Sequence, residues 1–218
     1  MQSVNVIGRG RVGSALAARL SEREVAVRED DVDLVVICVP DRAIPEVASS
    51  IEPGPWVAHV SGATPLGALE PHSKRLSVHP LQTFTLDRGP EQLDGAWAAV
   101  TAENVEARSV GWELADTLGL RPFDLDDGAR ILYHAGAAIA SNYLVTLYRA
   151  AARLFEGAEA PPEALVPLMT RTIENGFQLT GPISRGDWSV VDAHLDALHE
   201  QHPELEPMYR VLAEATAP

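Results

Sequence analysis

Three glycines near the start of the chain have the spacing of an anion-binding turn. Gly8, Gly10 and Gly13 follow a short apolar run and precede a segment whose apolar residues recur at helical spacing. Such a turn needs one glycine for the tight bend, one for close backbone approach to a pyrophosphate and one for helix packing against the strand. The helix N-terminus adds partial positive charge. The predicted cofactor-binding residues of this turn are Gly8, Arg9, Gly10, Arg11, Val12 and Gly13.

The segment after this turn is short for a complete dinucleotide-binding fold. An acidic residue that binds the ribose is expected about 20 positions on, where Glu29 and Asp30 lie, while Arg28 would suit a 2′-phosphate. Only about five residues separate the run that ends at Arg28 from Leu34, whereas a parallel crossover needs about a dozen or more.

Two readings of this segment stay open. In one, "EVAVRED" is a loop or a stub of a strand, which removes most of the adenosine pocket. In the other, "DLVVICV" is itself the second strand, and Asp41, just past its end, becomes the ribose ligand. The alternative for the whole motif is a glycine-rich turn that holds no ligand.

Polar residues also follow two later strands. His79 comes after the predicted strand Leu76–Val78, and Ser61 after Trp56–Val60. Ligands of open α/β sheets bind outside the carboxyl ends of strands, so His79 is placed to transfer a proton if its pKa is near neutrality. Gln82 lies in the same loop and is a candidate substrate-binding residue. The alternatives are a loop histidine fixed by its neighbouring proline and a serine that caps a helix.

A long helical pattern in the second half carries another polar group. His134, Ser141 and Asn142 share one helix face by i, i+3, i+4 spacing among small residues. Polar side chains on such a face are costly to bury unless they are paired. They are therefore candidate catalytic residues, and the alternative is a hydrogen-bond network between helices.

A later irregular stretch, "TGPISRGD", contributes Thr180 and Arg185 as candidate substrate-binding residues. Arg185 has the geometry to bind a carboxylate or phosphate bidentately. Its alternative role is a local salt bridge, with Asp187 capping the next helix. No metal site is predicted, because His199 and His202 lack further ligands of suitable spacing.

The elements that position these residues change in character along the chain. Short apolar strands alternate with helical segments up to about residue 124, which predicts a Rossmann-like, mostly parallel α/β sheet. One long helix follows from Asp126 to Gly157, and three further helices come after it. We therefore predict an α/β domain over residues 1–124 and an all-helical domain over residues 125–218.

Composition narrows the classes of function. The formal charge is −14, which argues against nucleic acid as a partner, because phosphate backbones need clustered Lys and Arg. No apolar stretch is long enough to cross a membrane, and no secretory signal pattern opens the chain. The single cysteine, Cys38, excludes an internal disulfide and fits a cytoplasmic location.

Several stretches together resemble one known family. They are "GRGRVGSALA", "VICVPDRAI", "HVSGATPLGAL", "SVHPLQTF", "YHAGAAIASNYLVTL" and "LTGPISRGD". The chain resembles proteins that join a Rossmann-like NAD(P)-binding domain to a helical domain of unknown function 2520, within the 6-phosphogluconate dehydrogenase-like superfamily.

This resemblance implies several roles. It implies NADP or NAD as cofactor, with Val39 and Pro40 beside the nicotinamide. It implies site roles for Ser141 and Asn142, and a homodimer formed through the helical domain. The second strand, helix and third strand of the family shrink here to "EREVAVREDDV", so the adenosine half is truncated.

Two functions follow. The first is an NAD(P)-dependent oxidoreductase acting on a small molecule in a cleft between the domains. The second is a non-catalytic or repurposed protein that has lost adenosine binding and binds another small anion or metabolite.

Overall fold

The computed structural model describes residues 1–217, which divide into two compact units between Ser141 and Asn142. The predicted boundary at residue 124 marks the end of the sheet, and the first unit continues into the helix that follows.

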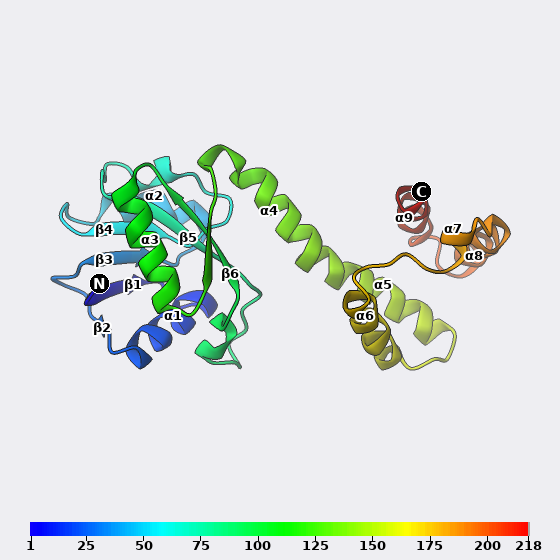
Figure 1. Ribbon diagram of the computed structural model, residues 1–218. Helices are drawn as coiled ribbons and strands as arrows, with labels where there is room; N and C mark the ends of the chain where they lie inside the picture. Colours follow the sequence, from blue (N-terminus) through cyan, green and yellow to red (C-terminus); the bar gives the residue numbers. More distant parts are fainter. Residues whose placement is uncertain (218) are drawn as a thin grey trace. The chain divides into compact units, whose positions relative to one another are not determined.

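The first unit is built on one seven-stranded sheet in the order β2-β1-β3-β4-β5-β6-β7 (Figure 1). Its strands are β1 (Ser3–Ile7), β2 (Ala26–Val27), β3 (Leu34–Ile37), β4 (Trp56–His59), β5 (Arg75–Leu81), β6 (Trp97–Ala102) and β7 (Arg121–Asp124). All neighbouring pairs are parallel except β5 and β6. The predicted Rossmann-like, mostly parallel sheet is confirmed.

Helices cover both faces of this sheet. They are α1 (Arg11–Glu22), α2 (Ile44–Ser49) and α3 (Val105–Thr117), and α4 (Arg130–Ala138) follows the last strand, with only its first residue, Arg130, buried (Figure 1). One face buries alternate strand residues such as Val4 and Leu76 against α1 and α3, in a cluster that includes Leu16 and Leu114. The other face buries a smaller cluster around Ile37 beneath α2. Buried apolar area of this kind is the main term that stabilises the unit.

The truncation on the adenosine side is visible at β2, which has two residues and pairs with one edge of β1. Val27 lies opposite Val4, and Leu34 lies opposite Val4 on the other edge of β1. The end of β2 and the start of β3 therefore lie opposite the same residue of β1. A short loop across β1 joins them, and no helix is needed to bring the chain back to the start of the next parallel strand. Of the two readings of this segment, the stub is confirmed, and "DLVVICV" forms β3 on the other edge of β1 rather than the second strand.

The connection between these strands crosses β1 on the face opposite α1. Asn5 Nδ2 donates to the backbone carbonyl of Glu29 at 2.9 Å and holds the crossing loop. A hollow of about 560 Å³ lies on this face between the loop and the end of α2. A six-residue loop thus replaces a helix and a strand.

Two strand predictions near the site were incomplete. β5 runs to Leu81, so His79 lies within a strand and pairs with Ala99 of β6 rather than lying in a loop. Pro80 is tolerated there because β4 pairs with β5 only as far as Ser77, which leaves that edge free. β7 is a strand that the sequence pattern did not predict.

The predicted long helix is present but not regular. A 3₁₀ turn capped by Asp126 leads into α4, a π-helical turn spans Ile139–Tyr143, and α5 (Leu144–Gly157) follows. The regular helical face predicted from His134 to Asn142 is wrong, because a π turn carries an extra residue and rotates the side chains after it.

The second unit contains α5 and four further helices among its described residues. These are α6 (Leu165–Glu174), α7 (Pro182–Arg185), α8 (Trp188–Gln201) and α9 (Glu206–Thr216). Many large apolar side chains on it are exposed, including Leu168, Phe177 and Trp188. Over residues 1–217, no helix has both the length and the apolar character needed to cross a membrane.

Candidate functional site

The glycine turn has two of the features that its spacing predicted, the tight bend at Gly8 and the close helix packing at Gly13. Gly8 has φ +95°, and a Cβ there would lie 2.7 Å from the Cys38 carbonyl oxygen. A Cβ on Gly13 would lie 1.8 Å from the Gly8 carbonyl oxygen, so helix and strand pack too closely for any side chain. Gly10 is different, since a Cβ there would meet nothing within 4 Å.

The open space beside Gly10 faces the start of α1. Gly10 is the N-cap, and no side chain caps the helix, so the first backbone N–H groups are left without an intrahelical partner. Arg9 and Arg11 are exposed on either side of Gly10. Uncapped N–H groups, the helix dipole and open space form the arrangement that binds a pyrophosphate.

The next two strands end beside this turn, because β1, β3 and β4 are neighbours in the sheet. Val39 lies against Gly8, since a Cβ added to Gly8 would be 3.1 Å from Val39 Cγ1. Ser61 Oγ donates to Asp41 Oδ2 at 2.9 Å and accepts from the backbone N–H of Thr64 at 3.0 Å. Ser61 therefore fixes its own loop, and Asp41 is already hydrogen-bonded to it.

A buried arginine from α4 joins the strand ends. Arg130 is 1% exposed, and its Nη1 donates to Thr101 Oγ1 at 2.8 Å. Its Nη2 donates to Ser77 Oγ at 3.0 Å and also to the Ser61 backbone carbonyl. The arrangement ties the first residue of α4 to the sheet face that carries Ser77 and Thr101, which pair across β5 and β6.

His79 lies two residues after Ser77 on β5, so its side chain is on the same face of the sheet. Its Nδ1 is 2.8 Å from the Tyr133 hydroxyl, and its ring contacts that of His134 edge-on at a centroid distance of 6.2 Å. Gly62 lies between the two histidines, since a Cβ there would be 2.7 Å from His134 and 2.9 Å from His79. Ser61, His79 and His134 thus gather in one place.

Burial controls the charge of this group. Burial, with the nearby His134 and the positive charge of Arg130, lowers the pKa of His79 to about 4. The expected pKa near neutrality is therefore wrong, and His79 is neutral at pH 7. Burial likewise raises the pKa of Tyr133 to about 12, so the phenol keeps its proton.

His59 is a second buried histidine, and sequence reasoning did not select it. It is fully buried on β4, and its Nδ1 accepts from the Ser61 backbone N–H at 3.2 Å. Burial, assisted by the charge of Arg130, lowers its pKa to about 3. His59 is therefore a neutral acceptor that shapes the loop after β4.

The other candidate residues lie in varied settings. Gln82 is exposed past β5, and its side-chain oxygen accepts from the Thr83 N–H. Ser141 Oγ donates to the Ala137 carbonyl at 2.7 Å within the π turn, and Asn142 is exposed in it. Roles for these residues stay predictions.

Two further candidates belong to the second unit. Thr180 is exposed in the loop before α7. Arg185 Nε donates to Asp187 Oδ2 at 2.9 Å, which is the local salt bridge of the alternative reading. Asp187 occupies the N-cap position of α8, but its carboxylate makes no capping hydrogen bond. The substrate-binding role of Arg185 stays a prediction.

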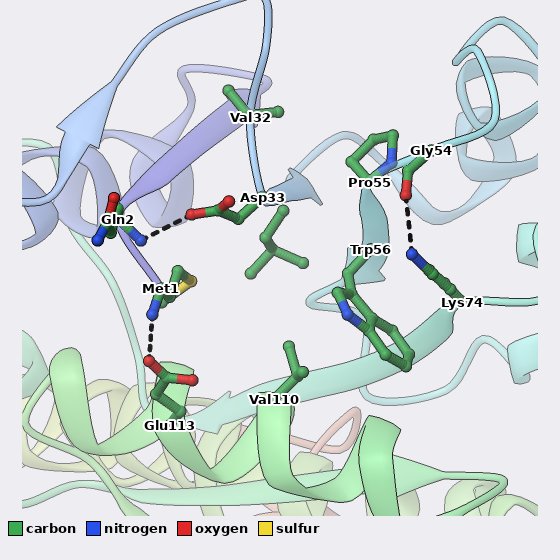
Figure 2. Close-up of a pocket in the computed structure, with 11 residues that line it drawn as sticks. Met1, Gln2, Val32, Asp33, Gly54, Pro55, Trp56, Lys74, Val110 and Glu113 are labelled. Atoms are coloured by element: carbon green, nitrogen blue, oxygen red, sulfur yellow. Dashed lines mark hydrogen bonds and ion pairs between the residues drawn. The ribbon is translucent and has the colours of Figure 1, made fainter.

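A separate hollow of about 540 Å³ lies at the amino ends of the strands (Figure 2). Its lining includes Asp33, Trp56, Lys74 and Glu113, and it contains none of the candidate residues. In the part of the chain that the structure describes, no three His, Cys, Asp or Glu side chains gather as a metal site.

Sequence reasoning missed Arg130 and Tyr133. An arginine at the start of a helix is usually exposed to solvent, so the residue type of Arg130 did not indicate that it would be buried beside the site. The available signal was spacing, since Arg130, Tyr133 and His134 fall at i, i+3 and i+4 and so lie on one face of α4.

The fold and site define a class: a Rossmann-like α/β unit with a glycine turn, followed by helices. The model of the domain of unknown function DUF2520 matches residues 96–216. The chain belongs to this family. No curated protein sequence matches it.

Solved structures show the same fold over nearly the whole chain. A protein from Bacteroides fragilis provisionally described as an NADP oxidoreductase is 22% identical, with a TM-score of 0.83 and coverage of 98% of this chain and 97% of that one. Protein TM1727 from Thermotoga maritima is 24% identical, with a TM-score of 0.74 and coverage of 97% and 98%. Pyrroline carboxylate reductase from Plasmodium falciparum, solved with NADP bound, is 12% identical, with a TM-score of 0.62 and coverage of 98% and 94%.

Proposed function

We propose that the protein is an NAD(P)-dependent oxidoreductase that acts on a small substrate. The observation that carries this proposal is the open, uncapped start of α1 at Gly10, at the same edge of the sheet as Ser61 and His79. The names of the similar structures, which include an NADP oxidoreductase and a reductase with NADP bound, support the same class of function.

The chain's own residues fit a dinucleotide on the pyrophosphate side. Gly8 and Gly13 hold the turn, and Gly10 leaves space for the phosphates. Val39 and Pro40 would border the nicotinamide, which when bound supplies or accepts a hydride. His79 would offer a hydrogen bond to the substrate, with His134 beside it. In such enzymes the protein orients both molecules and controls the proton.

A second candidate function is favoured by the two-residue β2. Without a complete second strand, helix and third strand, little of the usual adenosine-binding surface is present. In this candidate the glycine turn binds a smaller anion or metabolite, and the protein is a repurposed member of its family.

NADPH and reduced nicotinamide mononucleotide, which lacks the adenosine half, distinguish the two candidates. The quenching of tryptophan fluorescence would be titrated with each. The oxidoreductase proposal expects saturable NADPH binding that is at least about tenfold tighter than that of the mononucleotide. Equal affinities, or no saturation by NADPH, would favour the second candidate.

We also propose that the protein is a homodimer that pairs through its second unit. The buried apolar side chains there are few, among them Leu165, Val191 and Leu198, whereas many large ones are exposed. Exposed apolar surface of this extent marks an interface, and a second copy of the chain is the partner that we propose.

A further inference from the structure

Arg130 is an unusual buried cation. Its guanidinium is 1% exposed, yet the three groups that accept its hydrogen bonds are two hydroxyls and one backbone carbonyl. Buried charges are normally paired with an opposite charge. Within residues 1–217, the only carboxylate within 4.0 Å is that of Asp127, 3.9 Å from Nε, and it already accepts from the Leu66 N–H.

This leaves positive charge beneath the site that is only partly compensated. Nε of Arg130 has no hydrogen-bond partner among the described residues. Asp41 is the other nearby carboxylate, and it is exposed and bonded to Ser61. Solvent screens an exposed charge far more than a buried one, so the field at the site is positive.

His79 faces this field with one nitrogen engaged and one available. Nδ1 is bonded to Tyr133, while Nε2 has no partner within residues 1–217 and is not enclosed. An imidazole nitrogen is a stronger acceptor than a phenol oxygen, so the favoured arrangement has the Tyr133 O–H donating to Nδ1. The proton of the neutral ring then sits on Nε2, which becomes a donor.

We propose that the substrate of this oxidoreductase carries a carboxylate that accepts a hydrogen bond from His79 Nε2. Tyr133 and Arg130 act as positioning residues, the first by fixing the tautomer and the second by supplying the buried charge. That the bound carboxylate belongs to a substrate rests on the proposed function. The carboxylate site itself is defined by residues of the chain alone. A carboxylate is an acceptor-only anion, which matches a donor in a positive field.

The tautomer is tested on the ligand-free protein by ¹⁵N NMR of labelled histidine. The expected result is a proton on Nε2 of His79, and a shift toward a mixture of tautomers in Tyr133→Phe, which keeps the ring and loses the hydroxyl. A wild-type His79 with its proton on Nδ1 would overturn the proposal. So would a tautomer that Tyr133→Phe leaves unchanged.

The charge is tested with pyruvate and pyruvamide, which differ only in carboxylate against neutral amide. Saturable shifts of the His79 resonances are expected with pyruvate. The affinity for pyruvate that they report should be at least about tenfold higher than the affinity for pyruvamide. Arg130→Met should remove this preference and raise the pKa of His79, whereas Arg130→Lys should retain much of it. The groups that face His79 are His59, Asp41, Arg130, Tyr133 and His134.

No cofactor is added, so failure of NADPH to bind leaves this result interpretable. If Arg130→Met does not fold, the comparison of the two probes on the wild-type protein still decides. Equal affinity for pyruvate and pyruvamide, or no saturable effect of pyruvate on His79, would contradict the proposal. A preference for pyruvate that a folded Arg130→Met variant retains would also contradict it.

Discussion

At the scale of single residues, burial decides what the polar groups at the strand ends can do. His59 and His79 are held neutral beside Arg130, so both act through hydrogen bonds rather than through charge. His79 is therefore a poor general acid at pH 7 in the free protein. Any proton that it supplies must come from its neutral N–H or after a bound anion raises its pKa.

The two buried histidines predict acid sensitivity. Unfolded histidine binds a proton below about pH 6.5, whereas folded His79 does so only below about 4 and His59 below about 3. The unfolded state thus binds more protons in this window, and the free energy of unfolding falls as the pH drops from about 6.5 toward 3. Each pKa unit is worth about 1.4 kcal/mol.

His59→Asn checks this sign, since an amide oxygen can replace the Nδ1 acceptor and does not titrate. Urea unfolding at pH 7 and pH 5 should show a smaller acid-induced loss in the variant than in the wild type. His199→Asn, on an exposed histidine, is the matched control. An equal loss in all three proteins would show that His59 is not the responsible group.

At the scale of elements, the unusual feature is the loop that crosses β1 in place of a helix and a strand. The side-chain hydrogen bond from Asn5 to the Glu29 carbonyl holds it to the sheet. Asn5→Ala should lower the free energy of unfolding by about 1 kcal/mol and speed amide exchange over residues 28–33. Asn175→Ala, at an exposed helix end, serves as control. Unchanged exchange in the loop would mean that this bond does not hold it.

The sequence predicted the elements that repeat a strong pattern and missed those set by tertiary context. The strands around Val36 and Ala58 are continuous buried apolar runs, and they were placed correctly. β7 contains Pro122 and two charged residues, and it is a strand only because the edge of β6 pairs with it. No residue type around Ser141 marks a π turn, so its presence there could not be predicted.

The same contrast holds for the site. The glycine spacing pointed to Gly10, and the expectation of polar residues at strand ends pointed to Ser61 and to His79, although His79 lies within β5 near its end. The contribution of α4 could not be predicted, since its packing places an arginine in a buried position that its residue type disfavours.

At the scale of the whole molecule, the exposed apolar surface of the second unit predicts a homodimer. Sedimentation at micromolar concentration should give twice the 23.4 kDa chain mass. Phe177→Asp, at a residue 72% exposed, should weaken the dimer, whereas Glu106→Lys, at an exposed position of α3 in the first unit, should not. A wild-type monomer at that concentration would refute the dimer.

The central claim, that the glycine turn binds a dinucleotide, is tested most directly by calorimetric titration of NADPH into the wild type and Gly10→Ala. The added methyl group meets no protein atom within 4 Å, so the variant should fold and keep its melting temperature within about 2 °C. It would nevertheless occupy the space into which a pyrophosphate must come. The account predicts saturable binding to the wild type and at least about tenfold weaker binding to the variant. No binding to the wild type at millimolar NADPH, or equal binding to both, would contradict it.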